Sequence, residues 1–93
     1  MRESEIEETI DGFVQAARRC HEAGFDGVEV WAAYHGMLDQ FWTPWSNRRT
    51  DKWGGSLENR MRFFFEMLDG VRERVGPDFI IGARFTADED LEG

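Results

Sequence analysis

Apolar residues recur every three or four positions near the start of the chain, and this spacing predicts an amphipathic helix. The positions are Ile6, Ile10, Phe13, Val14, Ala17 and Cys20, and they fall on one helical face. Ser4 and Glu7 fit the reciprocal capping pattern that opens a helix, and Gly24 suits the residue just past its end. We therefore interpret Cys20 and His21 as a packing position and its flank rather than as chemical groups.

A second helical repeat is predicted between residues 57 and 75. Its apolar positions are Leu57, Met61, Phe64, Phe65, Leu68, Val71 and Val75. Gly76 and Pro77 follow at once and end the helix. The neighbouring Phe63 and the other aromatic residues of this segment are interpreted as core packing rather than as a cofactor site.

Two short apolar runs, residues 25–33 and 79–85, are predicted to be buried strands. Glu29 interrupts the first run, and a buried carboxylate needs a partner. We expect it to pair with a cation such as an Arg of a neighbouring element; the alternative is that it faces a polar interior. Strands that alternate with helices favour parallel pairing. Two strands are too few for an independent sheet, so we expect a segment of a larger α/β domain, or one completed by another part of the same assembly.

The stretch from residue 39 to residue 60 is rich in Trp and Arg and contains helix-breaking Pro44 and Gly54. It predicts an ordered loop of about 15 residues, a length that is usually functional in compact domains. Ser56 is expected to cap the helix that follows. The charged residues are expected to fix the loop through ion pairs and helix-end contacts; they are Asp39, Arg48, Arg49, Asp51 and Arg60.

Composition narrows the class of protein. The 93 residues carry 11 basic and 19 acidic side chains, a formal charge of −8, which disfavours nucleic acid and anionic membranes as partners. No apolar run is long enough for a membrane span, and the first residues do not resemble a signal peptide, so a cytoplasmic location is expected. Cys20 is the only cysteine, which excludes an internal disulfide and a four-cysteine metal centre within these residues.

Candidate chemistry lies where the predicted strands end, because parallel α/β folds bind ligands there. Arg84 ends the second strand and could stabilise an anionic ligand group or serve as a structural ion-pair partner. Tyr34 and His35 could handle a proton. Trp31 and Tyr34 could present aromatic faces to a cationic substrate, or simply fill the mouth of a barrel. No Walker-type or dinucleotide-type glycine loop is present.

Several segments together resemble the old yellow enzyme family of FMN-dependent oxidoreductases. They are Ala-Gly-Phe-Asp-Gly-Val-Glu-Val at 23–30, Leu-Asp-Gln-Phe at 38–41, Asn-Arg-Arg-Thr-Asp-Lys-Trp-Gly-Gly-Ser-Leu-Glu-Asn-Arg-Met-Arg-Phe at 47–63, Val-Gly-Pro-Asp-Phe at 75–79 and Gly-Ala-Arg at 82–84. The resemblance covers nearly the whole chain. It implies a partial (β/α)8 TIM barrel in which residues 1–93 supply helix 3, strand 4, helix 4 and strand 5, incomplete at both ends.

The resemblance also implies roles for single residues. Arg84 would contact the pyrimidine side of the flavin. The family's His-x-x-His/Asn-Gly-Tyr motif, which holds substrate and donates a proton, falls on Trp31, Tyr34 and Gly36, so the ligand imidazoles and the phenol are missing. His35 lies one residue from the expected histidine. The trimethylamine dehydrogenase-like branch has an aromatic residue at the Trp31 position, which favours N-methylated amines as substrates.

The expected protein is thus an FMN-dependent oxidoreductase that exchanges hydride between flavin and a small organic substrate. Trp31 and Tyr34 would bind substrate, Tyr34 or His35 would handle the proton, and Arg84 would bind the cofactor, with no metal site in this segment. NAD(P)H is a candidate second cofactor, and a 4Fe-4S cluster would lie only downstream. The alternatives are an ene-reductase of activated C=C bonds, an inactive or structural segment, and an aromatic-cage module that binds amines. Residues 1–93 alone are expected to be inactive.

Overall fold

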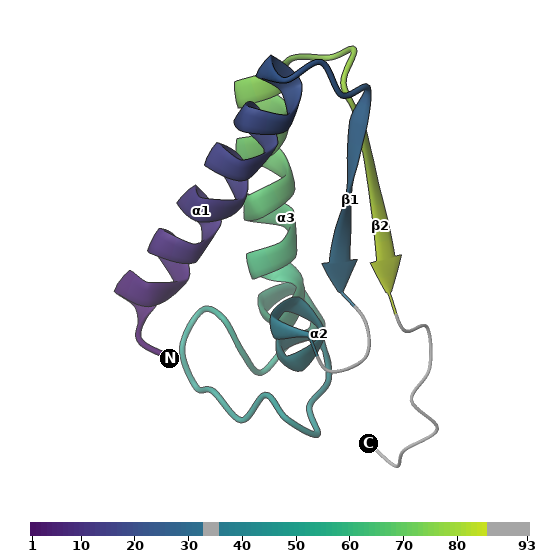
Figure 1. Cartoon of the computed structure of the whole chain (residues 1–93). Helices are drawn as coiled ribbons and strands as arrows, with labels where there is room; N and C mark the ends of the chain where they lie inside the picture. Colours follow the sequence, from purple (N-terminus) through teal and green to yellow (C-terminus); the bar gives the residue numbers. More distant parts are fainter. Residues whose placement is uncertain (33–35, 86–93) are drawn as a thin grey trace. The chain divides into compact units, whose positions relative to one another are not determined.

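The computed structural model describes residues 1–32 and 36–85. Its elements are, in chain order, α1 (Glu3–Glu22), β1 (Gly27–Ala32), α2 (Met37–Trp42), α3 (Leu57–Val75) and β2 (Ile80–Phe85). The two strands pair as neighbours and run in the same direction, as the arrows in Figure 1 show. The predicted helices, strands and parallel pairing are confirmed. The short helix α2 was not predicted, because part of it falls in the stretch interpreted as loop.

The register of the two strands follows from one hydrogen bond and one close approach. The Ile80 N–H donates to the Asp26 carbonyl over 3.0 Å. A Cβ built on Gly27 would lie 2.5 Å from the Ile80 carbonyl oxygen, so these two residues stand opposite each other and only glycine fits here. Along parallel strands, the same register sets Trp31 opposite Arg84.

The ends of α1 follow local backbone chemistry. The helix begins at Glu3 with Arg2 as the N-cap, and the Glu5 carboxylate accepts the Arg2 backbone N–H over 2.9 Å. The predicted cap at Ser4 is therefore wrong, because Glu5 closes the first turn two residues earlier and Ser4 already lies inside the helix. At the other end Gly24 has φ of +92°, and the Phe25 N–H reaches back to the Cys20 carbonyl over 3.1 Å. Gly24 thus ends the helix as predicted.

One compact unit comprises Met1–Glu29 and Phe65–Gly82. Its core is formed by the apolar sides of α1 and the C-terminal part of α3, with the buried residues Ile6, Ala17, Met67, Val71, Val75 and Phe79. A Cβ on Gly70 would lie 2.9 Å from a Val14 methyl group. The missing side chain at Gly70 therefore lets the two helices approach closely.

The second unit comprises Val30–Phe64 and, among described residues, 83–85. Its buried hydrophobic residues are Val30, Ala32, Leu38, Phe41, Trp53, Phe63 and Phe64. Phe63 lies edge-on to Phe41 and Trp53, at centroid distances of 4.8 and 6.3 Å. The predicted core face of the second helix is corrected here: Leu57 and Phe65 are 63% and 54% exposed, because the loop packs Trp53 against Phe63 and shifts the buried stripe.

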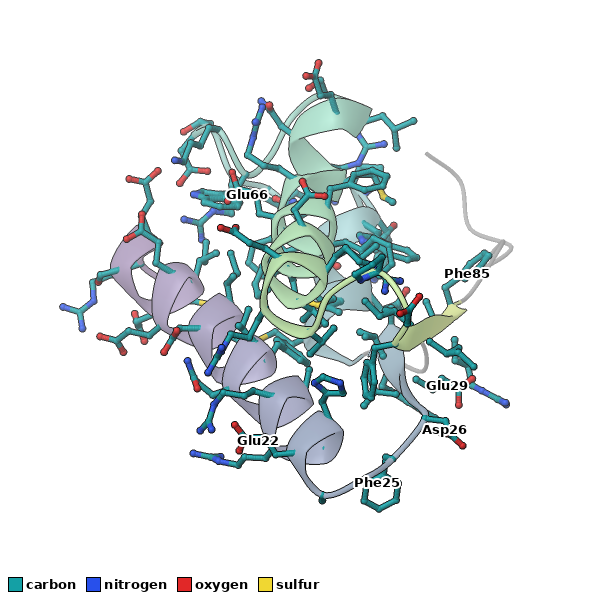
Figure 2. All side chains as sticks on the ribbon, turned by 90° about the horizontal axis from the view of Figure 1, so that it is seen from above. Glu22, Phe25, Asp26, Glu29, Glu66 and Phe85 are labelled. Carbon is teal, nitrogen blue, oxygen red and sulfur yellow. The ribbon has the colours of Figure 1, made fainter. Side chains whose placement is uncertain are left out.

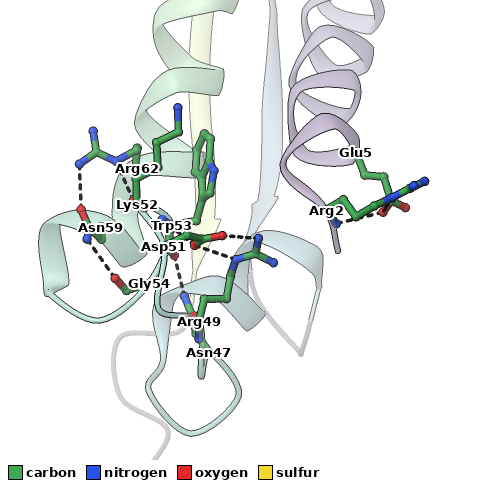
Figure 3. Close-up of polar contacts among 10 residues, drawn as sticks. All are labelled: Arg2, Glu5, Asn47, Arg49, Asp51, Lys52, Trp53, Gly54, Asn59 and Arg62. Carbon is green, nitrogen blue, oxygen red and sulfur yellow. Dashed lines mark hydrogen bonds and ion pairs between the residues drawn. The ribbon is translucent and has the colours of Figure 1, made fainter.

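The loop between α2 and α3 is ordered around the buried amide of Asn47. Its Nδ2 donates to the Phe41 and Trp53 carbonyls over 2.7 and 2.9 Å, and its Oδ1 accepts the Arg49 N–H over 3.1 Å (Figure 3 shows the last of these). The Arg49 guanidinium donates two hydrogen bonds to the Asp51 carboxylate, over 3.0 and 2.7 Å. This contact lowers the pKa of the Asp51 carboxyl.

Arg48 and Arg60, the other arginines expected to fix the loop, donate hydrogen bonds to backbone carbonyls. Arg60 donates to the Trp42 carbonyl at the end of α2 over 2.8 Å and to the Gly55 carbonyl over 2.7 Å. Arg48 donates to the Trp45 carbonyl over 3.3 Å. The expected ion pair is confirmed for Arg49 with Asp51, and the expected helix-end contact is confirmed for Arg60. Ser56 caps α3, since its Oγ accepts the Asn59 N–H over 3.1 Å. Within residues 1–32 and 36–85, no helix has the length and apolar content of a membrane span.

Candidate functional site

The candidate site lies at the C-terminal ends of β1 and β2. Side chains alternate along β1, so Val30 and Ala32 are buried while Trp31 is 51% exposed. Glu29 is exposed on the same face as Trp31. Both strands were predicted to be buried, but the described residues cover only one face of β1, and most of β2 is also exposed. The face of β1 that carries Glu29 and Trp31 is the more exposed one.

The register brings Trp31 and Arg84 together on this exposed face. Neighbouring strands lie about 4.8 Å apart, so the two side chains leave the sheet side by side. Glu29 stands opposite Gly82, whose lack of a side chain leaves space beside the carboxylate. Figure 2 shows Glu29 projecting outward from β1. At the strand ends, an indole and a guanidinium therefore share one face.

Of the other residues predicted for the site, the structure describes Gly36 but not Tyr34 or His35. Tyr34 and His35 lie outside the described residues, so their roles stay predictions. Gly36 is the N-cap of α2 with extended backbone, φ −61° and ψ 166°. Any L-residue adopts this conformation, so the backbone does not require glycine at the position where the family motif has tyrosine.

Trp42 belongs to the Trp-rich stretch of residues 39–60, and the structure places it at the end of α2. Its ring lies edge-on to Phe64 at 5.0 Å and tilts against Phe85 at 5.9 Å. Phe85 directly follows Arg84, and Arg60 holds the Trp42 carbonyl. Trp42 thus supports the end of β2 from the helical side. Its buried indole Nε1 has no hydrogen-bond partner in the structure.

The residues present fit one edge of a flavin. Arg84 is exposed and offers a permanent positive charge to an anionic ring edge, and Trp31 offers an aromatic wall beside it. Residues 1–32 and 36–85 contain no group of three His, Cys, Asp or Glu side chains that could hold a metal ion.

The sequence matches the NADH:flavin oxidoreductase / NADH oxidase family over residues 1–93. An N,N-dimethylglycine/sarcosine dehydrogenase of Chromohalobacter salexigens is 52% identical over 96% of this chain and 13% of the relative. An NADH oxidase of Thermoanaerobacter brockii is 50% identical over 97% and 14%. A multifunctional alkene reductase/demethylase of Caballeronia cordobensis is 42% identical over 96% and 13%.

Solved structures of oxidoreductases are also similar to this chain. A 2-naphthoyl-CoA reductase complex superposes with a TM-score of 0.87 at 47% identity, over 89% of this chain and 13% of that protein. An old yellow enzyme from Pichia sp. AKU4542 gives 0.85 at 45% identity, over 91% and 22%. The three relatives are named as a dehydrogenase, an oxidase and a reductase/demethylase, all of them oxidoreductases. The chain belongs to the NADH:flavin oxidoreductase / NADH oxidase family, to which its resemblance to old yellow enzyme pointed. It spans only 13–14% of the length of the three curated relatives above.

Proposed function

We propose that residues 1–93 form the helix 3 to strand 5 segment of an FMN-dependent (β/α)8 barrel that oxidises a small N-methylated amine. The observation that carries this proposal is the pairing of Trp31 with Arg84 on one face at the C-terminal ends of two parallel strands. This is the end at which barrel enzymes bind their ligands. A bound FMN would supply the hydride-accepting chemistry.

Arg84 has the role of cofactor contact. A guanidinium stays protonated at all physiological pH values. Its fixed positive charge would therefore stabilise a planar ring that carries negative charge at the edge nearest the guanidinium. Preorganised charges of this kind are worth more than mobile ones, because they need no rearrangement during the reaction. The contacts of Phe85 with Trp42, and of Trp42 with Arg60, hold the strand end that carries Arg84.

Trp31 has the role of substrate wall. Its indole is half exposed, and a methylated ammonium group against an indole face gains roughly 0.5–2 kcal/mol, the larger value when water is excluded. Tyr34 would form a second wall, and Tyr34 or His35 would carry the substrate proton. The dehydrogenase relative acts on N,N-dimethylglycine and sarcosine according to its name, which supports a methylated amine as the substrate class.

Ene reduction of activated C=C bonds with NAD(P)H is the second candidate. It is supported by the relative named as both an alkene reductase and a demethylase. Gly36 weighs against it, because this position carries no phenol to protonate the substrate carbon. The two candidates therefore differ in the direction of hydride transfer: amine oxidation moves hydride to the flavin, and ene reduction moves it from the flavin to the substrate. Only ene reduction needs a proton donor at the position of Gly36.

The test uses the full-length protein that contains this chain, purified with its flavin. Arg84→Ala should lower flavin occupancy or slow flavin reduction at least tenfold, in line with the loss of a preorganised charge. Arg84→Lys should recover part of the loss, since it restores the charge without the planar fork. Arg74→Ala, an exposed arginine in the last turn of α3, is the matched control. Wild-type occupancy and reduction rate in Arg84→Ala would overturn the assignment.

A further inference from the structure

A concave site lies where the strands begin, not where they end. It is a cavity of about 340 Å³ lined by the aromatic residues His21, Phe25 and Phe79, the acidic residues Asp26 and Asp78, and the apolar residues Val75 and Pro77. Asp26 directly precedes β1, and Phe79 directly precedes β2. None of these residues takes part in the proposed flavin chemistry. The volume lies at the lower end of the range for small-molecule pockets.

Hydrogen bonds to backbone carbonyls fix the walls of this cavity. The turn at Gly24 holds Phe25 through its N–H bond to the Cys20 carbonyl. The Asp26 carbonyl is held by the Ile80 N–H. On the other side, Arg72 donates to the Gly76 and Phe79 carbonyls over 2.9 and 2.6 Å. The cavity is therefore preformed, which lowers the entropic cost of binding.

The lining of the cavity selects a cation. Phe79 is buried and its ring meets the His21 ring edge-on at 5.1 Å, so these two form a fixed aromatic base. Phe25 is 63% exposed, and Figure 2 shows it and Asp26 projecting outward from the connection between α1 and β1. Asp26 and Asp78 are both exposed at the cavity. No Lys or Arg side chain lines it.

Aromatic faces beside carboxylates suit an alkylated ammonium ion, because the rings contact its methyl groups while the carboxylates balance its charge. A metal ion is a poorer match, since the described residues offer no group of three metal-ligating side chains. The formal charge of −8 further favours cations near the surface.

We propose that this cavity is a binding site for a small alkylammonium ion, separate from the proposed substrate site at Trp31. Binding of an alkylammonium ion to this cavity needs no flavin chemistry, so a binding measurement alone tests it. In an enzyme that acts on methylated amines, such a site would let a compound of the substrate class occupy a second position.

The test is calorimetric titration of the full-length protein with choline, and with 3,3-dimethyl-1-butanol as the neutral isostere. Choline should bind and the neutral isostere should bind at least tenfold more weakly. The double substitution Asp26→Asn with Asp78→Asn should weaken choline binding at least tenfold. Phe25→Ala, at an exposed position, should weaken it severalfold. Asp69→Asn, an exposed carboxylate on α3, is the matched control and should leave binding unchanged.

Trp31→Ala distinguishes this cavity from the proposed substrate site. Choline binding that persists in Trp31→Ala and is lost in the double Asp variant supports the proposal. The opposite pattern assigns choline to the substrate site and overturns it, as does no binding by the wild-type protein or equal binding of the neutral isostere. Circular dichroism checks that the double variant is folded; if it is not, Asp78→Asn alone takes its place and should still weaken binding severalfold.

Discussion

Asn47→Ala should loosen the loop between α2 and α3 more than any other single amide change there. The amide is only 8% exposed and makes three hydrogen bonds, to the carbonyls of Phe41 and Trp53 and from the N–H of Arg49. Each bond is worth about 0.5–1.5 kcal/mol net, and the buried carbonyls would lose their donors. The expected loss is therefore about 2–4 kcal/mol of local stability.

Hydrogen–deuterium exchange of the full-length protein, followed by mass spectrometry, measures this loss directly. A drop of that size corresponds to exchange roughly 30- to 1,000-fold faster for amides that exchange by local opening. The peptides to follow are those that cover residues 43–56. Asn47→Asp keeps the shape and the acceptor but loses both donors, so it should be at least as damaging.

Thr50→Ala provides the control, since Thr50 is exposed in the same loop and its exchange should match the wild type. Loop exchange in Asn47→Ala within threefold of the wild type would refute the reasoning. In that case the ion pair of Arg49 with Asp51, not the Asn47 amide, would be the main restraint on the loop.

Three further predictions follow from the same geometry. Gly54→Ala should destabilise the loop by about 1–3 kcal/mol, because the new Cβ would lie 2.7 Å from Arg49 Cβ and from Asn47 Oδ1; a thermal melt unchanged from the wild type would contradict this. The guanidinium of Arg49 holds the pKa of Asp51 low, so the pair stabilises the loop above the unfolded pKa of about 3.9 and loses this effect as the pH falls through the lower folded value. Exchange corrected for intrinsic rates should therefore rise below pH of about 4 in the wild type and respond less in Asp51→Asn, by about 1 kcal/mol or less for a partly exposed pair. Gly36→Tyr should raise enone reduction by the full-length protein at least tenfold if the missing phenol limits that activity, and no gain in activity would place the limit elsewhere.

The sequence predicted the elements whose signals are local. The existence of α1 and α3, the stop at Gly24 and the cap at Ser56 all depend on neighbours within one or two turns, and they are confirmed. The start of α1 was wrong because two overlapping caps compete and Glu5 closes the earlier one. Helix α2 was missed because its six residues are too few to show a period.

Features that depend on distant contacts were not predictable in detail. The buried face of α3 is set by Trp53 packing on Phe63, a contact between a loop and a helix that no local pattern reveals. The sequence placed Trp31 and Arg84 on one rim. That they stand directly opposite each other depends on the strand register, which the close approach of Gly27 and Ile80 determines.

The central proposal, that this chain is part of a flavin enzyme that oxidises methylated amines, is tested most directly by absorbance. The full-length protein should be yellow as purified, and under anaerobic conditions its flavin band should bleach on addition of N,N-dimethylglycine or trimethylamine without NAD(P)H. Bleaching by NAD(P)H alone, followed by reoxidation with an enone, would instead support ene reduction. A full-length protein that holds no flavin, even after reconstitution with FMN, would contradict the account.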